Sequence, residues 1–440
     1  MKRLLARVLY WLIAAAGVGS LPAAEPRVLL DARFGDAAAA EGWKPWTPRA
    51  EISPQFAFDP TGGQAGGALK MTASAPSTFG AWRRQITGVA AGRSYRFTAW
   101  FRGENIANER RSVIPRLQWL DAKGQPVKGA IRPPEYVLDV GRENGWTRVE
   151  STLQAPASAE GLDVQLSLAF AAGASLWWDR VVLAEVDTPR GRIARVMTVH
   201  LRPRGLRSAA ANVEAYCATV LQQRDQKPDI ICLPEGMTVV GTGKSYVEVG
   251  ESLPGPTTER LGALARELNS YIVAGLYERE APAVYNTAVL IDRNGLLVGR
   301  YRKTHLPREE WEQGLTPGDT YPVFDTDFGR IGIMVCWDLQ FPEPWRALGQ
   351  QGAELVLLPI WGGSETLLRA RAIENHAFVV SSSYDMRSCV VAPDGQILAE
   401  ATTASPVATA EVHLDRKIYQ TWLGDMSTRT WKERRGELPP

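Results

Sequence analysis

The pattern of hydrophobic residues changes once along this chain of 440 residues, and the change divides the chain into two parts. Before it, short apolar or alternating runs are separated by turn residues, which is typical of the strands of a β-sandwich. After it, apolar strands alternate with amphipathic helices, which is typical of a layered α/β domain. A polar stretch with Pro and Gly, residues 187–191, lies between them. The sequence therefore predicts two domains, residues 26–186 and residues 192–440.

The first domain is predicted to be an all-β jelly-roll sandwich. Turn signals rich in Gly, Asn and Asp recur between the apolar runs, and no helical pattern of useful length interrupts them. The strands expected here span residues 68–73, 94–101, 113–120, 147–153, 164–170 and 176–183.

Aromatic residues in this domain have two expected roles. Tyr95, Trp146 and Trp178 fall on expected strands, where an aromatic side chain is most often part of the core. Trp43 and Trp46 lie in a Pro-containing loop, so they are the better candidates for stacking on a sugar. The order of these features resembles the galactose-binding-like jelly rolls that include many carbohydrate-binding modules. The resemblance implies the fold, and it makes a glycan the partner to consider for this domain.

The second domain is predicted to contain the chemistry. Its expected strands span residues 193–199, 229–233, 271–276, 288–291, 296–301, 331–335, 354–358 and 378–382. Its expected helices span residues 207–223, 257–269 and 365–375.

The first residues of the chain have the pattern of a secretory signal peptide, residues 1–24. Lys2, Arg3 and Arg7 precede an apolar stretch that is followed by small residues and Pro. The apolar stretch is shorter than the roughly 18 to 20 residues of a membrane span, so an uncleaved anchor is the weaker alternative. We therefore expect export to the periplasm or the extracellular space. Cleavage would remove three basic residues and change the formal charge from +2 to −1.

Several partners are not expected from the composition. A charge this close to zero, without a long basic block, argues against nucleic acid. The four histidines are scattered and no Cys-x-x-Cys pair occurs, so we expect neither a metal nor another cofactor. Cys217 and Cys232 lie on apolar patterns and are predicted to be buried core thiols rather than halves of a disulfide framework.

Three expected strands of the second domain end in chemically useful side chains. Glu235 follows a buried strand that Pro234 stops, Lys303 follows a hairpin strand, and Cys336 ends a further buried strand. Strand ends are where α/β folds place catalytic groups. A carboxylate, an ammonium and a thiol that converge there are sufficient to activate the thiol as a nucleophile.

At these residues the chain resembles the nitrilase superfamily of carbon-nitrogen hydrolases, across about residues 192–415. Four segments stand in that family's order: Leu-Pro-Glu235-Gly, Tyr-Arg-Lys303-Thr-His-Leu-Pro, Thr-Pro-Gly-Asp319 and Cys336-Trp-Asp-Leu-Gln-Phe-Pro-Glu343. The resemblance implies a four-layer α-β-β-α sandwich, commonly dimerised, so a homodimer or higher homo-oligomer is expected. It also implies a thiol hydrolase that cleaves a non-peptide carbon-nitrogen bond of the amide, carbamoyl or nitrile type.

Each residue of the triad has an expected role that follows from its chemistry. Glu235 takes the proton of Cys336, and Lys303 favours the thiolate. Lys303 and the backbone N–H of Trp337 stabilise the negative charge that develops on the substrate.

The resemblance also implies a second glutamate between the lysine and the Pro-Gly-Asp segment. Glu310 is the preferred candidate and Glu312 the alternative, because the spacing is one residue away from expectation for either. His305 offers a rival Cys-His arrangement of the papain type, although a structural hydrogen-bonding role suits it better.

Two other functions remain open from the sequence. An N-acyltransferase would use the same thioester with an amine as acceptor, and a carbohydrate-binding protein could retain an inactive hydrolase domain. The intact Glu235, Lys303 and Cys336 favour an active hydrolase. The sequence leaves the acyl group of the substrate undetermined.

Overall fold

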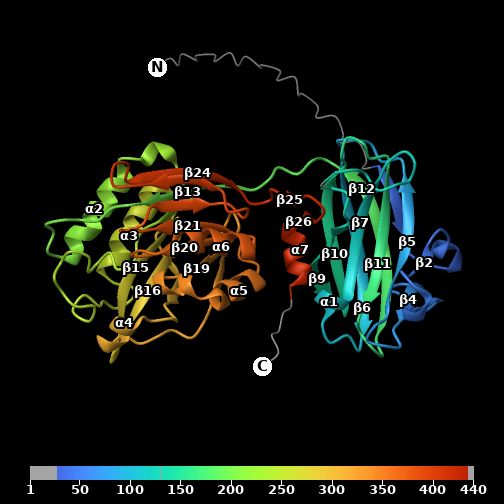
Figure 1. Ribbon diagram of the computed structural model, residues 1–440, viewed down its shortest axis with the longest axis horizontal. Helices are drawn as coiled ribbons and strands as arrows, with labels where there is room; N and C mark the ends of the chain where they lie inside the picture. Colours follow the sequence, from blue (N-terminus) through green and yellow to red (C-terminus); the bar gives the residue numbers. More distant parts are fainter. Residues whose placement is uncertain (1–26, 130, 435–440) are drawn as a thin grey trace, which may run out of the picture.

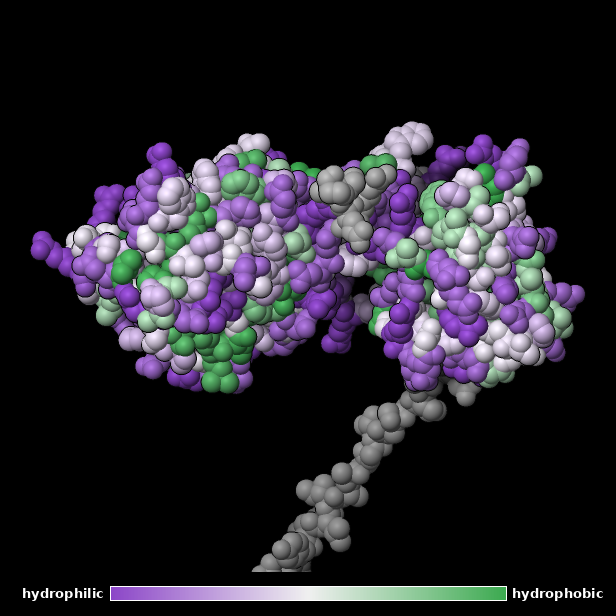
Figure 2. Space-filling view, turned by 90° about the horizontal axis from the view of Figure 1, so that it is seen from below, coloured by the Kyte–Doolittle hydropathy of each residue, from purple (hydrophilic) through white to green (hydrophobic). Residues whose placement is uncertain are grey.

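The computed structural model describes residues 27–129 and 131–434, and the predicted signal peptide lies outside them. Two bodies stand side by side, an all-β sandwich and a larger α/β domain (Figure 1). Residues 187–192 belong to no helix or strand and connect the two. The space-filling view shows two lobes with largely hydrophilic surfaces that meet over a narrow junction (Figure 2).

The first body consists of two antiparallel sheets. The larger sheet has seven strands: β1 (Val28–Ala32), β3 (Gln55–Asp59), β4 (Ala68–Thr72), β6 (Ser94–Glu104), β9 (Leu138–Glu143), β10 (Trp146–Gln154) and β12 (Ser175–Val186). The smaller sheet has five: β2 (Lys44–Trp46), β5 (Phe79–Thr87), β7 (Val113–Leu120), β8 (Glu135–Tyr136) and β11 (Gly161–Ala169). A single helical turn, α1 (Glu109–Ser112), precedes β7. The predicted all-β class is confirmed.

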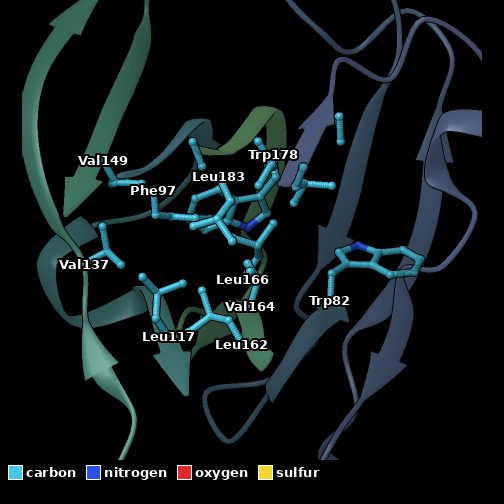
Figure 3. Close-up of a cluster of buried hydrophobic side chains, with 14 of the residues drawn as sticks. Trp82, Phe97, Leu117, Val137, Val149, Leu162, Val164, Leu166, Trp178 and Leu183 are labelled. Atoms are coloured by element: carbon cyan, nitrogen blue, oxygen red, sulfur yellow. The ribbon is translucent and has the colours of Figure 1, made fainter. Parts of the chain in front are cut away.

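The core of the sandwich lies between the two sheets because alternate residues of each strand point inward. Phe97, Phe101 and Trp178 of the larger sheet are fully buried and pack with residues of the smaller sheet, such as Leu166 (Figure 3). The predicted core positions of Tyr95, Trp146 and Trp178 are confirmed.

The two tryptophans proposed for sugar stacking are placed differently from expectation. Trp43 lies in a loop as expected, but it is only 5% exposed and packs at a tilt against Phe34, so the prediction that it is exposed for sugar stacking is wrong. Trp46 lies on β2 and is partly buried against Phe79. Proline in this segment suggested a loop, but a short edge strand tolerates proline.

The second body has two central sheets. One sheet has the order β17-β16-β15-β14-β13-β24: β17 (Leu297–Arg302), β16 (Ala283–Ile291), β15 (Tyr271–Glu280), β14 (Ile230–Cys232), β13 (Ile193–Val199) and β24 (Val407–His413). The other has the order β18-β19-β20-β21-β22-β23: β18 (Val323–Asp325), β19 (Arg330–Ile333), β20 (Leu355–Pro359), β21 (Phe378–Ser382), β22 (Ser388–Val391) and β23 (Ile397–Ala401).

Helices cover the outer faces of these sheets and complete a four-layer α-β-β-α sandwich (Figure 1). Helices α2 (Ala209–Leu221) and α3 (Pro256–Leu268) pack on the first sheet. Helices α5 (Pro342–Gln350) and α6 (Glu365–Asn375) lie on the second sheet. Residues of both sheets share one core, which explains why their strands are near-continuous apolar runs. The predicted fold class of this domain is confirmed, as is the burial of Cys217 and Cys232.

The end of the described chain leaves the second body and returns to the first. We call residues 415–434 the C-terminal segment; it contains β25 (Tyr419–Gln420), β26 (Gly424–Asp425) and α7 (Met426–Glu433). Helix α7 stands between the two bodies (Figure 1), and its Lys432 reaches Asp139 of β9. It contacts β8 and α1. The sequence division at residue 192 remains a prediction, but this segment of the second predicted domain lies against the first.

No helix in residues 27–129 and 131–434 is both long enough and apolar enough to cross a lipid bilayer.

Trp178 provides a test of the sandwich core. Its side chain is fully buried and its ring centroid lies 5.4 Å from that of Phe101. Replacing it with Ala removes a large buried ring and leaves a cavity, so Trp178→Ala should lower the free energy of unfolding of the sandwich by about 3 to 5 kcal/mol in urea. The matched control is Trp422→Ala, because Trp422 is 79% exposed. The control should change that free energy by less than about 0.5 kcal/mol, and equal losses in both variants would contradict the assigned core.

Candidate active site

Glu235 lies just beyond the carboxyl end of β14, and its backbone is fixed from two sides. The Tyr384 hydroxyl donates a hydrogen bond of 2.8 Å to the Glu235 carbonyl. Gly275 of β15 passes so close that an added Cβ would lie 2.5 Å from the Glu235 Cα, so only glycine fits there. The Glu235 carboxylate is only 3% exposed.

Lys303 follows β17 and places a fully buried ammonium group between two carboxylates. Its Nζ donates to Glu235 Oε1 at 3.1 Å and to Glu310 Oε1 at 2.8 Å. Burial alone would lower the pKa of Lys303, but Glu235, Cys336 and Glu310 outweigh it and hold that pKa above its ordinary value. Lys303 is therefore a permanent positive charge in the site.

Glu310 lies on the short helix α4 (Arg308–Glu312), and its carboxyl group is 8% exposed. Burial, followed by the charge of Glu235, raises the pKa of Glu310 to about 7, although Lys303 acts in the opposite direction. Glu312 points elsewhere, since it is 54% exposed and faces Arg308 at 3.7 Å. Of the two candidates for the fourth site residue, the structure brings Glu310 to the cluster and leaves Glu312 on the surface.

Asn286 of β16 completes the hydrogen-bonded cluster. Its Nδ2 donates to Glu235 Oε1 at 2.8 Å and to Glu310 Oε1 at 3.0 Å, and the side chain is buried. Lys303 and Asn286 thus donate to the same oxygen of each carboxylate. Two carboxylates this close would repel each other, and these shared donors hold them in one arrangement.

Cys336 begins a tight turn, residues Cys336–Gln340, and Met334 and Val335 separate it from the end of β19. Its φ is +46°, a conformation that residues other than glycine rarely adopt, and such strain clusters at functional sites. Burial and then the charge of Glu235 raise the pKa of the Cys336 thiol, while Lys303 and the N–H of Trp361 lower it. The net shift is upward, so the resting thiol holds its proton and needs a base.

Asp338 joins the turn that carries Cys336 to the segment that carries Lys303. This fully buried carboxylate accepts hydrogen bonds from the Val335 N–H at 3.0 Å and from the Tyr301 hydroxyl at 2.8 Å. It also faces His305, with Nδ1 at 2.9 Å and the backbone N–H at 3.2 Å. His305 is thereby directed to Asp338, and its ring stacks on Phe341 with centroids 4.4 Å apart.

Aromatic side chains surround the cluster. Tyr246 and Tyr277 stack with ring centroids 4.7 Å apart, and Glu235, Glu310 and Cys336 act on both phenols electrostatically. Trp361 packs edge-on against Tyr384 at 4.9 Å. The Trp337 side chain is 41% exposed and lies edge-on to Phe341.

The described residues contain no group of three or more His, Cys, Asp or Glu side chains placed to hold a metal ion. The expectation that the protein works without a metal or another cofactor stays a prediction.

The family model that matches this chain covers residues of the second body. The family model described as carbon-nitrogen hydrolase covers residues 202–420. Deaminated glutathione amidase of Synechocystis is 32% identical over 222 residues, which is 43% of this chain and 82% of that protein. Human omega-amidase NIT2 is 29% identical over 231 residues, 47% of this chain and 84% of that protein. The chain therefore belongs to the nitrilase superfamily of carbon-nitrogen hydrolases.

Two of the solved structures that match this chain each cover about half of it. Nit3 of Saccharomyces cerevisiae is 24% identical, with a TM-score of 0.46 over 50% of this chain and 90% of that one. An amidase double mutant from Nesterenkonia in complex with acrylamide is 26% identical, with a TM-score of 0.46 over 52% and 96%.

The sequence pointed to the ionisable groups of the cluster but not to the residues that hold them. Asp338 lies inside one of the four segments quoted from the sequence, Asn286 lies in none of the four, and neither residue had an assigned role. Their partners come from other strands and become visible only in the fold. A buried polar residue beside a catalytic motif is the one signal that the sequence offers for them.

Asp338 allows a test of how the site is held. Asp338→Asn keeps the shape but turns an amide N–H₂ toward groups that donate, so it should cost about 3 kcal/mol in the free energy of unfolding of the hydrolase domain, measured in urea. Asp225→Asn, at an exposed aspartate, is the control and should be near neutral. A stability of Asp338→Asn equal to that of the control would show that Asp338 does not hold the two segments.

Glu310 predicts a pH dependence of stability. The pKa of Glu310 is raised to about 7 in the folded protein, so the folded state binds this proton more tightly than the unfolded state does. The resulting contribution to the free energy of unfolding is complete below the unfolded-state pKa and is lost as the pH rises through about 7. Between about pH 5 and about pH 8, the wild type should lose about 2 kcal/mol of unfolding free energy relative to Glu310→Gln. Glu312→Gln, the exposed neighbour, should follow the wild-type curve. Parallel curves for Glu310→Gln and wild type would contradict the raised pKa.

Proposed function

We propose that this carbon-nitrogen hydrolase is an exported thiol amidase that hydrolyses a small amide through a thioester on Cys336, with Glu235 as the base and Lys303 as the stabilising cation. The observation that carries the proposal is the buried Lys303 ammonium, which lies between Glu235 and Glu310 and acts on the Cys336 sulfur. The similarity to an omega-amidase and a deaminated glutathione amidase supports amides over nitriles as substrates.

The first half of the proposed reaction follows from the proton positions. The Cys336 thiol is protonated at rest because burial and Glu235 raise its pKa. As sulfur attacks the amide carbon, its proton moves to Glu235 and the carbonyl oxygen becomes negative. Lys303 Nζ and the Trp337 backbone N–H stabilise that oxygen. The C–N bond then breaks, Glu235 gives its proton to the leaving nitrogen, and a thioester remains.

Water completes the cycle. Glu235, again a carboxylate, takes a proton from water, whose oxygen attacks the thioester carbon. The C–S bond breaks, the acid leaves, and the proton held by Glu235 returns to the Cys336 sulfur. Glu310 and Asn286 keep the Glu235 carboxylate and the Lys303 ammonium in place through both halves.

Export rests on the sequence of residues 1–24, and a glycan partner for the sandwich rests on its resemblance to carbohydrate-binding modules. Trp43 is buried and therefore gives this glycan partner no support. We retain the homo-oligomer as part of the proposal, with the resemblance as its support.

A screen for ammonia release tests the proposed activity. The panel should include amides, nitriles and N-carbamoyl compounds, with charged and uncharged acyl groups, because the rings of Tyr246 and Tyr277 favour uncharged ones. Glu235→Gln and Lys303→Ala should each lower kcat at least about 100-fold, the low end for a positioned base or oxyanion group. Cys336→Ala is the blank, and Glu312→Gln is the control that should keep full activity.

The proposal fails if no member of the panel is turned over above the Cys336→Ala blank. The assigned roles of Glu235 and Lys303 are wrong if Glu235→Gln or Lys303→Ala keeps full activity. In that case His305 would again be a candidate for activating the Cys336 thiol.

A further inference from the structure

The C-terminal segment is bound to the β-sandwich by buried charges. Glu135 of β8, whose side chain is 4% exposed, forms an ion pair with Lys417 and accepts a hydrogen bond from the Tyr419 hydroxyl at 3.2 Å. Lys432 of α7 is 2% exposed and reaches Asp139 of β9 at 3.5 Å. Buried charges of this kind are costly unless paired, so the segment and the sandwich depend on each other for their arrangement.

Further contacts continue along α7 to the end of the described chain. The Tyr136 hydroxyl donates to Glu433 at 2.8 Å. Arg110 of α1 lies over the Trp431 ring at 5.1 Å, and its Nη2 donates to the Arg434 carbonyl at 3.2 Å. The backbone of Arg434 is therefore positioned by the sandwich.

The Arg434 side chain points the other way, onto the hydrolase body. Its Nη1 donates to Asn375 Oδ1 at 3.1 Å, and its Nη2 donates to the Glu374 carbonyl. Both acceptors are at the C-terminal end of α6, where helix carbonyls lack partners within the helix. A cation at this end also suits the helix dipole. Arg434 thus caps α6 from outside the hydrolase fold.

Helix α6 in turn holds the turn that carries Cys336. Arg371 of α6 is 5% exposed, and its Nε donates to the Leu339 carbonyl while its Nη2 donates to the Gln340 carbonyl, both at 3.1 Å. These carbonyls belong to the turn Cys336–Gln340. Asn375 links the two arginines, because its Nδ2 donates to the Arg371 carbonyl at 3.0 Å.

We propose that the β-sandwich helps to position the catalytic cysteine: it fixes the C-terminal segment, Arg434 of that segment caps α6, and Arg371 of α6 holds the strained turn of Cys336. This inference rests on the proposed role of Cys336 as the nucleophile. Arg434 is a positioning residue, since it touches neither substrate nor the reacting atoms. A sandwich that served only as a docking module would need no more than the linker of residues 187–192.

The test compares full-length variants. Arg434→Met keeps the length of the side chain and removes its donors, so kcat should fall about 3- to 20-fold with KM little changed, the range expected for a remote positioning residue. The rate at which iodoacetamide alkylates Cys336, measured by mass spectrometry, should change in the same variant. Hydrogen exchange should rise in α6 and in residues 336–340. Arg434→Lys, which retains the charge and one set of donors, should restore part of kcat.

A matched control lies on α7, which ends just before Arg434. Arg429 bonds within the C-terminal segment, to Glu433 at 2.8 Å and to the Leu423 carbonyl at 2.7 Å. Arg429→Met should therefore keep the wild-type kcat, alkylation rate and exchange. A second variant, Asp139→Asn, loosens α7 on the sandwich side without touching the hydrolase body, and it should lower kcat in the same direction as Arg434→Met.

The proposal is overturned if Arg434→Met folds and has the same kcat and the same rate of Cys336 alkylation as the wild type. If Arg434→Met does not fold, Asp139→Asn decides, and a wild-type kcat with wild-type exchange in α6 overturns it. Alkylation and exchange require no turnover, so they still test the positioning if no amide proves to be a substrate. The failure of the proposed activity is thereby separate from the failure of the proposed positioning.

Discussion

The buried ammonium of Lys303 is the charge around which the hydrolase site is organised. It has no exposed surface and lies between Glu235 and Glu310. Removing an ammonium from water costs several kcal/mol, which only close opposite charges and hydrogen bonds repay. The same cation lets two carboxylates remain close together and offsets part of the effect of Glu235 on the Cys336 thiol. One buried cation therefore contacts both carboxylates and acts on the thiol.

The folding of the hydrolase body brings these groups together from three separate strand ends and from helix α4. Because residue 275 is glycine, β15 can pass close to Glu235. Asp338 links the segment that carries Lys303 to the turn that carries Cys336 through hydrogen bonds. Neither group takes part in the proposed chemistry. They limit how far the reacting atoms can move relative to one another. Holding reacting groups in the correct orientation can account for a large part of an enzyme's rate enhancement.

Much of this arrangement could be predicted from the sequence. The strands of residues 193–199 and 378–382 and the helix of residues 365–375 were expected at the bounds observed, because strong apolar patterns and turn residues delimit them. Glu235, Lys303 and Cys336 could be chosen because strand ends collect reactive side chains. Short or edge elements such as α4, β2 and β18 were not expected, since their form depends on tertiary contacts rather than on local pattern.

The contacts between the two bodies could not be predicted from the sequence, for a physical reason. The linker suggested independent modules, but Lys432 with Asp139 and Arg434 with Asn375 are pairs separated by hundreds or tens of residues, which no local pattern reveals. Charged side chains near a C-terminus are usually expected to be exposed to solvent. Here the structure buries Lys432 at the edge of the sandwich, where α7 also covers edge strands that would otherwise be open to pairing.

The most direct test of the thioester chemistry is to trap the covalent intermediate. Glu235→Gln lacks the base that activates water, so any acyl-enzyme that forms slowly with an amide should persist long enough for intact-mass analysis. The mechanism predicts a mass increase equal to the acyl group, located on the peptide that contains Cys336 and released by hydroxylamine. Turnover of the amide by the wild type with an adduct on another residue, or an adduct that survives in Cys336→Ala, would contradict it.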